Sequence, residues 1–387
     1  MRSRRAFLDS TLKGAAGIAL LSRIPLAAAA APGNSPPSTR EALIAVLKAV
    51  GKTPEMVITP DGSSVLLLPY GGRVLGLYAP TSDENFYWTH PALDSMDTAR
   101  KFYESKEWHN SGGDRTWLAP EVDVFFPNFP NKDVYFQPRE LDPGNYQLAK
   151  TDHTVRLVNR FAITLSRTKL KADLEITKSV GPAPNPLRYE RGLPLDGVAY
   201  AGYAQYTSLE LLGESAKSDA RVGLWNLVQM PHGGDLLVPT YFRTEPTICF
   251  GKISPEDLMV HDHLIRYKMR ATGEHKITIR AVATAGRVGY LYPTGDQWAL
   301  IVRNFTVNPS GEYIDAPWSD PEHLGYSTQA CNVNSALGRF SELEYHIPAI
   351  GQGAGRTRCD DAAQVWAFRG PREKIDRVVK NLLTPED

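Results

Sequence analysis

The sequence predicts an all-β, mainly antiparallel protein in one domain with a short helix near each end. Many short runs alternate apolar with polar residues, and Gly, Pro, Asn and Asp separate these runs, which is typical of strands joined by tight turns. Apolar residues with helical spacing occur before residue 51 and after residue 370. Residues 52–370 contain no stretch of linker composition, which favours one large sandwich or barrel over two domains.

Residues 1–31 have the layout of an export signal, with a charged head, a short apolar stretch and the small residues Ala27–Ala31 for cleavage. The head, Ser3–Leu8, matches the S-R-R-x-F-L pattern of twin-arginine signals at each specified position. The alternatives are an ordinary export signal and an unremoved anchor. Against an anchor, the apolar stretch is short for a bilayer span and Arg23 interrupts it. We therefore expect the twin-arginine translocation machinery as a partner, a periplasmic or extracellular location, and no membrane span in the mature form.

The mature part, residues 32–387, is expected to form the single domain. A helix at about 39–50 follows the capping box Ser38–Glu41 and ends at Gly51. A closing helix at about 371–383 follows Pro371 and carries four apolar residues at helical spacing. Between the helices, strands are expected in nine runs: 55–59, 65–68, 73–77, 154–166, 171–178, 264–270, 276–283, 299–305 and 342–347.

Composition excludes several classes of function. The 43 basic and 43 acidic residues give zero formal net charge and form no basic stripe, so no nucleic acid is expected as a partner. The sequence contains no Gly-rich phosphate loop, Cys-x-x-Cys pair, haem signature, G-x-S-x-G elbow or H-E-x-x-H helix, so no cofactor is expected. The many Trp, Tyr and Phe residues suit either sugar faces or a large β core. Three cysteines leave disulfide pairing open, and Cys331 with Cys359 is one possible pair.

The densest polar motif spans His109–Glu121, where two glycines precede a carboxylate, a guanidinium and an indole. Gly112 and Gly113 permit backbone approaches that a side chain would block. The guanidinium of Arg115 can grip vicinal hydroxyls or a uronate carboxylate, and Trp117 offers a ring face to a sugar. The alternative is a turn that an ion pair of Arg115 with a nearby carboxylate holds in place. The candidate substrate-binding residues of this motif are Arg115, Asp114, Trp117 and Glu121.

Two further segments carry candidate residues. Leu224–Asp235 combines Trp225, a candidate sugar-binding residue, with His232 near the end of an apparent strand. In Phe340–Pro348, alternation places Glu342, Glu344 and His346 on one strand face, where they could line a polar cleft or face solvent. The two histidines of residues 261–263 share a strand face, but nothing nearby completes a ligand set, so no metal site is expected.

Taken together, these segments resemble the galactose mutarotase-like superfamily of the aldose 1-epimerase type, in an uncharacterised bacterial branch with a G-G-D-R-T-W motif. The resemblance covers about residues 55–350. It implies a two-sheet β-supersandwich that binds sugars in an open cleft. The segments that carry it are Tyr70–Leu77, Glu84–Trp88, Gly112–Trp117 and Ser341–Glu344.

In that superfamily a late-strand Glu acts as the general base on the anomeric hydroxyl, and a His protonates the ring oxygen. The resemblance implies Glu344 as the base, with Glu342 second. The family's N-H-x-Y-F-N-L motif is missing, since the corresponding segment Tyr200–Ser208 contains no His. His109 and His232 are therefore the candidate acids, and Arg115 would orient the sugar.

The sequence thus predicts an exported carbohydrate-active protein with acid/base chemistry of the aldose epimerase type, an isomerase. The alternatives are a noncatalytic periplasmic carbohydrate-binding protein and a purely structural envelope protein. A glycoside hydrolase or lyase on the same fold is also open, for which Glu344 with Glu121 or Asp114 would supply the two acid/base groups.

Overall fold

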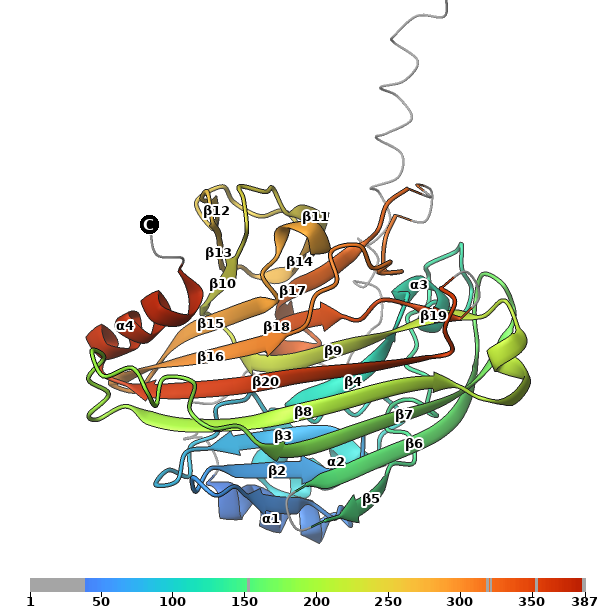
Figure 1. The fold of residues 1–387 in the computed structure, drawn as a ribbon. Coiled ribbons are helices and arrows are strands. Elements are labelled where there is room, and N and C mark those ends of the chain that lie inside the picture. Colours follow the sequence, from blue (N-terminus) through green and yellow to red (C-terminus); the bar gives the residue numbers. More distant parts are fainter. Residues whose placement is uncertain (1–38, 152–153, 318–319, 321, 352–353, 385–387) are drawn as a thin grey trace, which may run out of the picture.

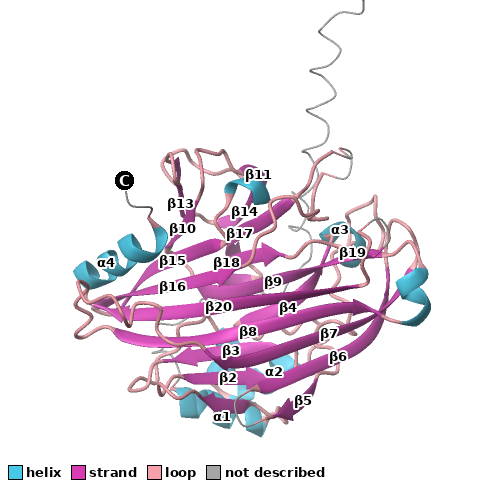
Figure 2. Cartoon of the chain, in the orientation of Figure 1, coloured by secondary structure: helices cyan, strands magenta, loops and turns pink. Residues whose placement is uncertain are grey.

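The computed structural model describes residues 39–151, 154–317, 320, 322–351 and 354–384. The expected export signal and cleavage region lie outside the described residues. Two large sheets lie over one another, and every strand pair within them is antiparallel (Figures 1 and 2). The predicted fold class, an all-β antiparallel sandwich with helices near both ends, is confirmed.

The first sheet presents the face on which the candidate site lies. Its strands follow the order β1 (Glu55–Ile58), β2 (Ser64–Leu68), β3 (Arg73–Tyr78), β4 (Asp114–Ala119), β9 (Arg221–Pro231), β18 (Gly338–His346), β17 (Tyr326–Ser335), β14 (Gly273–Arg280) and β11 (Thr247–Phe250), with β19 (Ile350–Gly351) beside β9.

The second sheet backs the first and closes the core. Its order is β12 (Leu258–Val260), β13 (Leu264–Lys268), β10 (Asp235–Pro239), β15 (Arg287–Thr294), β16 (Gln297–Phe305), β20 (Arg358–Gly370), β8 (Ala199–Leu211), β7 (Lys171–Pro182), β6 (Val155–Thr164) and β5 (Gln147–Lys150). Each of the nine expected strand runs overlaps a strand of one sheet or the other.

The helices cover the outer faces of the sheets. The helix α1 (Arg40–Ala49) lies beside β2 (Figure 1). The Thr39 side chain caps its N-terminus, and Leu43 and Leu47 pack on the leucines of β2. The helix α4 (Arg372–Leu383) buries Ile375 and Val378 against β16 and β20. Both agree with the sequence prediction to within two residues.

Two short helices were not expected from the sequence. The segment of α2 (Met96–Glu104) carries Ala99, Phe102 and Tyr103 at helical spacing, and these pack in the same cluster as α1, a pattern that the sequence prediction did not use. One turn, α3 (Glu121–Val124), follows β4 directly and places Glu121 at the edge of the sheet face. Short 3-10 turns complete the helical elements of the described chain, at η2 (Pro91–Asp94), η3 (Gly213–Lys217) and η4 (Ala281–Ala283).

Alternation along β18 decides which side chains enter the core. Leu343 and Tyr345 are fully buried between the sheets, and Tyr345 stacks on Phe305 of the second sheet. Glu342 and Glu344 therefore lie on the opposite face of the first sheet, as the period of two predicts.

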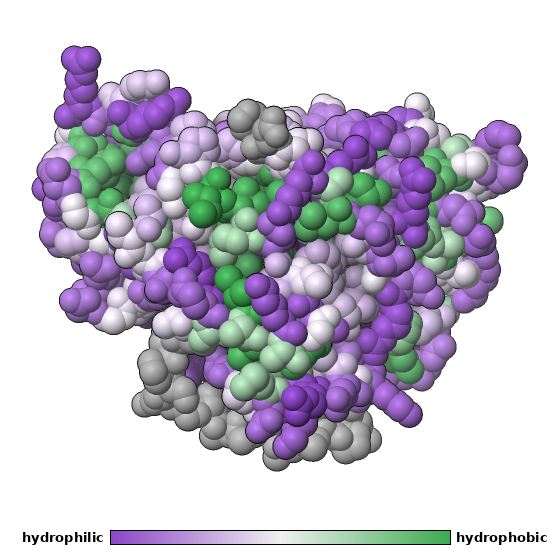
Figure 3. Space-filling model, turned by 90° about the horizontal axis from the view of Figure 1, so that it is seen from below, coloured by the Kyte–Doolittle hydropathy of each residue, from purple (hydrophilic) through white to green (hydrophobic). Residues whose placement is uncertain are grey.

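The surface and the cysteines add two structural facts. The face of the molecule in Figure 3 is mostly hydrophilic, with apolar areas that polar residues interrupt. None of the described helices is long and apolar enough to cross a membrane. Cys249, Cys331 and Cys359 are all free, and Cys331 and Cys359 belong to different sheets.

Candidate functional site

A cluster of charged, amide and aromatic side chains lies on the face of the first sheet that points away from the second sheet. Directly opposed residues in an antiparallel ladder share a face. The register pairs Trp117 of β4 with Trp225 of β9, and Gln229 of β9 with Glu342 of β18. Cys331 of β17 pairs with Glu342 on one side and with Lys276 of β14 on the other. Strands β4, β9, β18, β17 and β14 thereby contribute to one polar surface.

The Arg115 guanidinium is held by a carboxylate and two indoles. Its Nη2 donates to Glu342 Oε1 at 2.8 Å, and the Gln229 amide donates to the same oxygen at 3.0 Å. The guanidinium carbon lies 4.1 Å from the Trp117 ring centre and 5.3 Å from that of Trp108. Arg115 thus pairs across the sheet with Glu342, and not with its sequence neighbours Asp114 or Glu121.

Glu344 is the most deeply placed carboxyl group of the cluster. It is fully buried, and its Oε2 accepts from Trp225 Nε1 at 2.9 Å and lies 3.1 Å from Lys276 Nζ. Burial raises the pKa of the Glu344 carboxyl to about 7, although Lys276 opposes this rise. Burial alone would lower the pKa of Lys276, but Glu344 and Glu121 raise it well above its usual range. Glu344 is therefore the member of this pair that exchanges a proton near neutral pH.

A second carboxyl group lies near the same ammonium. Glu121 Oε2 lies 3.8 Å from Lys276 Nζ, and Glu121 Oε1 accepts from the Tyr135 hydroxyl at 3.1 Å. Burial raises the pKa of Glu121, and Lys276 opposes this shift. Asp315 joins the group by accepting from the Glu121 backbone amide at 3.2 Å and from the Gln329 amide at 3.0 Å.

His346 completes the row that begins with Glu342. Its ring stacks on Trp225 with 5.5 Å between ring centres, and its Nε2 lies 3.9 Å from Asp315 Oδ2. Burial lowers the pKa of His346 to about 4. The imidazole is therefore neutral at pH 7 and offers one donor and one acceptor.

Several buried polar atoms of this cluster have no hydrogen-bond partner within the described part of the chain. Buried polar atoms in folded proteins nearly always find partners, so such a concentration marks a surface suited to a polar ligand. The atoms are Arg115 Nε and Nη1, Gln229 Oε1, Gln329 Oε1, Glu344 Oε1 and both ring nitrogens of His346.

The cluster is nearly closed to solvent. The side chains of Glu121 and Asp315 are 22% and 16% exposed, whereas Arg115 and Lys276 are at most 6% exposed. The resemblance implied an open cleft, and the structure shows a nearly buried polar surface with these two carboxylates toward solvent.

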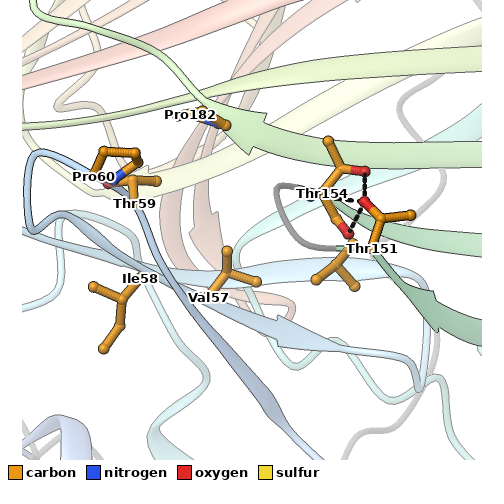
Figure 4. A pocket seen from close by; sticks show the side chains of 8 residues that line it. Val57, Ile58, Thr59, Pro60, Thr151, Thr154 and Pro182 are labelled. Atoms are coloured by element: carbon orange, nitrogen blue, oxygen red, sulfur yellow. Dashed lines mark hydrogen bonds between the residues drawn. The ribbon is translucent and has the colours of Figure 1, made fainter.

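A separate pocket lies on another part of the molecule (Figure 4). It is lined by residues 57–60, at the end of β1 and just after it, by Thr151, Thr154 and Val155 at the β5–β6 turn, and by Pro182. Two of its three threonines, Thr151 and Thr154, hydrogen-bond to each other. None of these lining residues is titratable, so this pocket offers no acid/base group.

Three residues predicted for the site lie elsewhere. Asp114 faces the space between the sheets, where its oxygens lie 2.6 Å from Lys178 Nζ and 2.7 Å from Arg303 Nη2, all three side chains being fully buried. His109 hydrogen-bonds to Tyr70, and its ring packs among the aromatic side chains between α2 and β3.

His232 follows β9 and is bonded through Nε2 to Asn332 Oδ1 at 3.0 Å. Asn332 also bonds the backbone of Ala271 and Gly273, at the end of the sheet. It is the neighbour of Cys331 in β17, so its side chain lies on the face opposite to Cys331 and Glu342. The structure brings Arg115, Trp117, Trp225, Glu121, Glu342 and Glu344 together and leaves Asp114, His109 and His232 apart.

A family model matches most of the chain. Residues 44–385 match the model of a family of unknown function, DUF6786. The chain belongs to this family. No curated protein matches the sequence.

Solved structures similar to this DUF6786 member include two sugar epimerase relatives. A GalM/aldose epimerase homologue from C. elegans has 8% identity and a TM-score of 0.39, over 83% of this chain and 99% of that chain. Galactose 1-epimerase from Lactobacillus acidophilus NCFM has 8% identity and a TM-score of 0.38, over 83% of this chain and 95% of that chain.

Sequence reasoning missed Lys276, Asp315, Tyr135, Trp108, Gln229 and Gln329. Lys276 lies within an expected strand, but nothing in its neighbourhood marks it, because its partners come from β18 and α3. Asp315 lies in a loop between β16 and β17, where no periodicity assigns a direction to a side chain. His346 was placed on the correct strand face but not among the candidate site residues.

Cys331, Glu342 and Glu344 bring three potential metal-ligand atoms within 4.8 Å of one another. Arg115 and Lys276 already neutralise the two carboxylates, and burial, with the two carboxylates adding to it, raises the pKa of the Cys331 thiol well above its usual range. A metal ion would have to displace both cations, so this donor set does not suit one. The histidines at 261 and 263 are exposed.

Proposed function

We propose that this protein is an exported carbohydrate-active protein that binds a sugar on the polar face of the first sheet and acts as an aldose epimerase-type isomerase. The observation that carries this proposal is Glu344, a fully buried carboxyl whose pKa burial raises to about 7 and which has one oxygen without a hydrogen-bond partner. A general base works best when its pKa lies near the operating pH.

The surroundings of Glu344 suit a sugar ring. Trp225 and Trp117 lie edge to face with 5.6 Å between ring centres, and Trp225 also donates to Glu344. Aromatic rings next to fixed polar groups match a sugar, which has apolar C–H patches between its hydroxyl groups. Arg115 and Gln329 retain polar atoms without partners that can bind those hydroxyls.

The proposed chemistry is the opening and reclosing of the sugar ring. Glu344 Oε1 takes the proton of the anomeric hydroxyl, the C1–O5 bond breaks with its electron pair going to O5, and O5 takes a proton from a general acid. After rotation about C1–C2, O5 attacks the opposite face of the aldehyde, O5 returns its proton to the acid, and Glu344 returns its proton to the new hydroxyl. Every proton is restored, so no other reactant is needed.

Glu121 is the residue that best suits the role of acid. Burial raises its pKa, the Tyr135 hydroxyl fixes one of its oxygens, and it shares the Lys276 ammonium with Glu344. Two carboxyl groups that share one ammonium provide an acid and a base within the same cluster.

Noncatalytic carbohydrate binding is the second candidate. Both histidines that sequence reasoning nominated as acids lie away from Glu344, and burial lowers the pKa of His346 to about 4. With no imidazole that is protonated at pH 7 beside Glu344 in the described chain, binding without turnover is the simpler use of the same aromatic and arginine contacts.

Anomer exchange measured by NMR on a panel of aldoses, together with binding by calorimetry and a glycan array, tests the two functions. We expect wild type to accelerate exchange and E344Q to lose about 100-fold or more of that rate while binding within about threefold of wild type. The control is E373Q, on the exposed side of α4. Binding without any rate enhancement would select the binding-protein function. The absence of binding to any glycan would refute the carbohydrate proposal altogether.

A further inference from the structure

The charge balance of the site carries information about its ligand. Among the described residues, three cations border this surface, Arg115, Lys276 and Arg73, and each lies within 4 Å of a carboxylate. Five carboxyl groups accompany them: Glu121, Asp142, Asp315, Glu342 and Glu344. The other titratable neighbours are neutral at pH 7, because burial lowers the pKa of His346 to about 4 and raises those of Tyr135 and Cys331 well above their usual ranges. Acidic groups therefore outnumber cations.

Arg115 is the group that a ligand anion would need, and its charge is already engaged. Glu342 Oε1 accepts from it at 2.8 Å in a pair whose side chains are 3% and 10% exposed. The guanidinium also stacks on Trp117, which fixes its plane. Its Nε–H and Nη1–H remain without partners, so it can still donate to neutral hydroxyl groups.

A sugar carboxylate that approached Arg115 would meet Glu342 on the same guanidinium and Glu344 two residues along the strand. Like charges brought together in a site that excludes water are strongly unfavourable. A neutral sugar makes the same hydroxyl contacts without that repulsion.

We infer that Glu342 is a specificity residue that, by neutralising Arg115, makes the site select uncharged sugars and reject uronic acids and other anionic sugars. This inference rests on the proposed carbohydrate function and adds the class of ligand. It also decides between the two uses of Arg115 that the sequence left open, the gripping of hydroxyls and the gripping of a uronate carboxylate.

The test compares sugars that differ only at C6: galactose with galacturonate, and glucose with glucuronate. Affinities are measured by calorimetry at pH 7.5 with the full mature chain. We expect wild type to prefer the neutral member of a pair by roughly tenfold or more, and E342Q to reduce that preference by roughly tenfold or more, because one repelling charge is removed. E373Q, a Glu→Gln change on the exposed face of α4, is the matched control and should keep the wild-type preference.

A second measurement needs no variant and covers the case in which E342Q folds poorly. Between pH 7.5 and 5.5, Glu344 takes up a proton, since burial raises its pKa to about 7. A uronate stays ionised over this range, as its carboxyl group has an ordinary pKa of roughly 3–4. The wild-type preference for the neutral sugar should therefore weaken as the pH falls.

The outcomes separate the two proposals. If wild type binds uronates as tightly as neutral sugars, or if folded E342Q keeps the full preference, the specificity role of Glu342 is refuted and the proposed function stands. If none of the four sugars binds and the glycan array is also blank, the carbohydrate function itself is refuted.

Discussion

Substitution of Asp114 by Asn should destabilise the fold and leave the ligand site in place. The Asp114 carboxylate is shared by Lys178 and Arg303, and all three side chains are fully buried between the sheets. Asn has nearly the same shape but no charge, so the variant retains two buried cations without this counter-charge. Removing one partner of a buried ion pair typically costs about 3–5 kcal/mol, and here two cations lose the same partner.

The expected shift in melting temperature follows from the size of the domain. With an unfolding entropy of roughly 2.1 cal/mol/K per residue, a domain of this size has about 0.7 kcal/mol/K, so a loss of 3–5 kcal/mol lowers Tm by about 4–7 °C. Thermal and urea unfolding followed by circular dichroism measure this directly. The control is D376N, which removes an exposed pair with Arg372 on α4 and should change stability by less than about 1 kcal/mol.

A double variant makes the reasoning sharper. In K178M, Asp114 is still paired with Arg303. D114N keeps two buried cations without the Asp114 charge, whereas D114N/K178M keeps only the Arg303 cation. The double variant should therefore be more stable than D114N alone, a reversal that loss of packing would not produce. A D114N protein that melts within about 1 °C of wild type, or a double variant less stable than D114N, would refute the charge argument.

Two further predictions concern the backbone and the pH dependence. In G113A the new Cβ would lie 2.3 Å from the Val74 carbonyl oxygen at a φ of +71°, so the free energy of unfolding should fall by more than about 2 kcal/mol. In G295A, at a φ of +58° with open space around the Cβ, it should fall by only about 1 kcal/mol. Urea unfolding of both variants separates the clash from the φ strain, and equal losses of stability would contradict the clash. Because the folded-state pKa of Glu344 is raised from 4.5 to about 7, the folded state binds the extra proton, and the stability contributed by this group falls as pH rises through that window. Relative to E344Q, wild type should lose up to about 3 kcal/mol between pH 4.5 and 7 and little more above pH 7, and parallel stability curves for the two proteins would exclude the shift.

The sequence could predict the elements because local patterns specify them. Helical spacing and end signals place α1 and α4, and turn residues mark the strand ends. The long strands β8 and β20 were not expected, because small and polar residues occupy both of their faces and blur the alternation.

The sequence also predicted part of the site, since strand alternation puts Glu342, Glu344 and His346 on one face without any tertiary information. The same rule separates Asp114 from Arg115, because successive side chains on a strand point to opposite faces. The prediction that the whole G-G-D-R-T-W motif binds the ligand overlooked this alternation of side chains. The two glycines of the motif allow close backbone packing beside Trp88 and Val74.

What the sequence alone determined is therefore the set of strands and helices and which residues share a strand face. Which face packs on the second sheet was decided only by the tertiary structure, where Lys178 and Arg303 of that sheet meet Asp114. The partners of Glu344 were decided there too, because Lys276 and Glu121 arrive from β14 and α3. The register between strands that are far apart in the chain depends on packing across the whole sandwich. The alternation along a single strand does not predict that register.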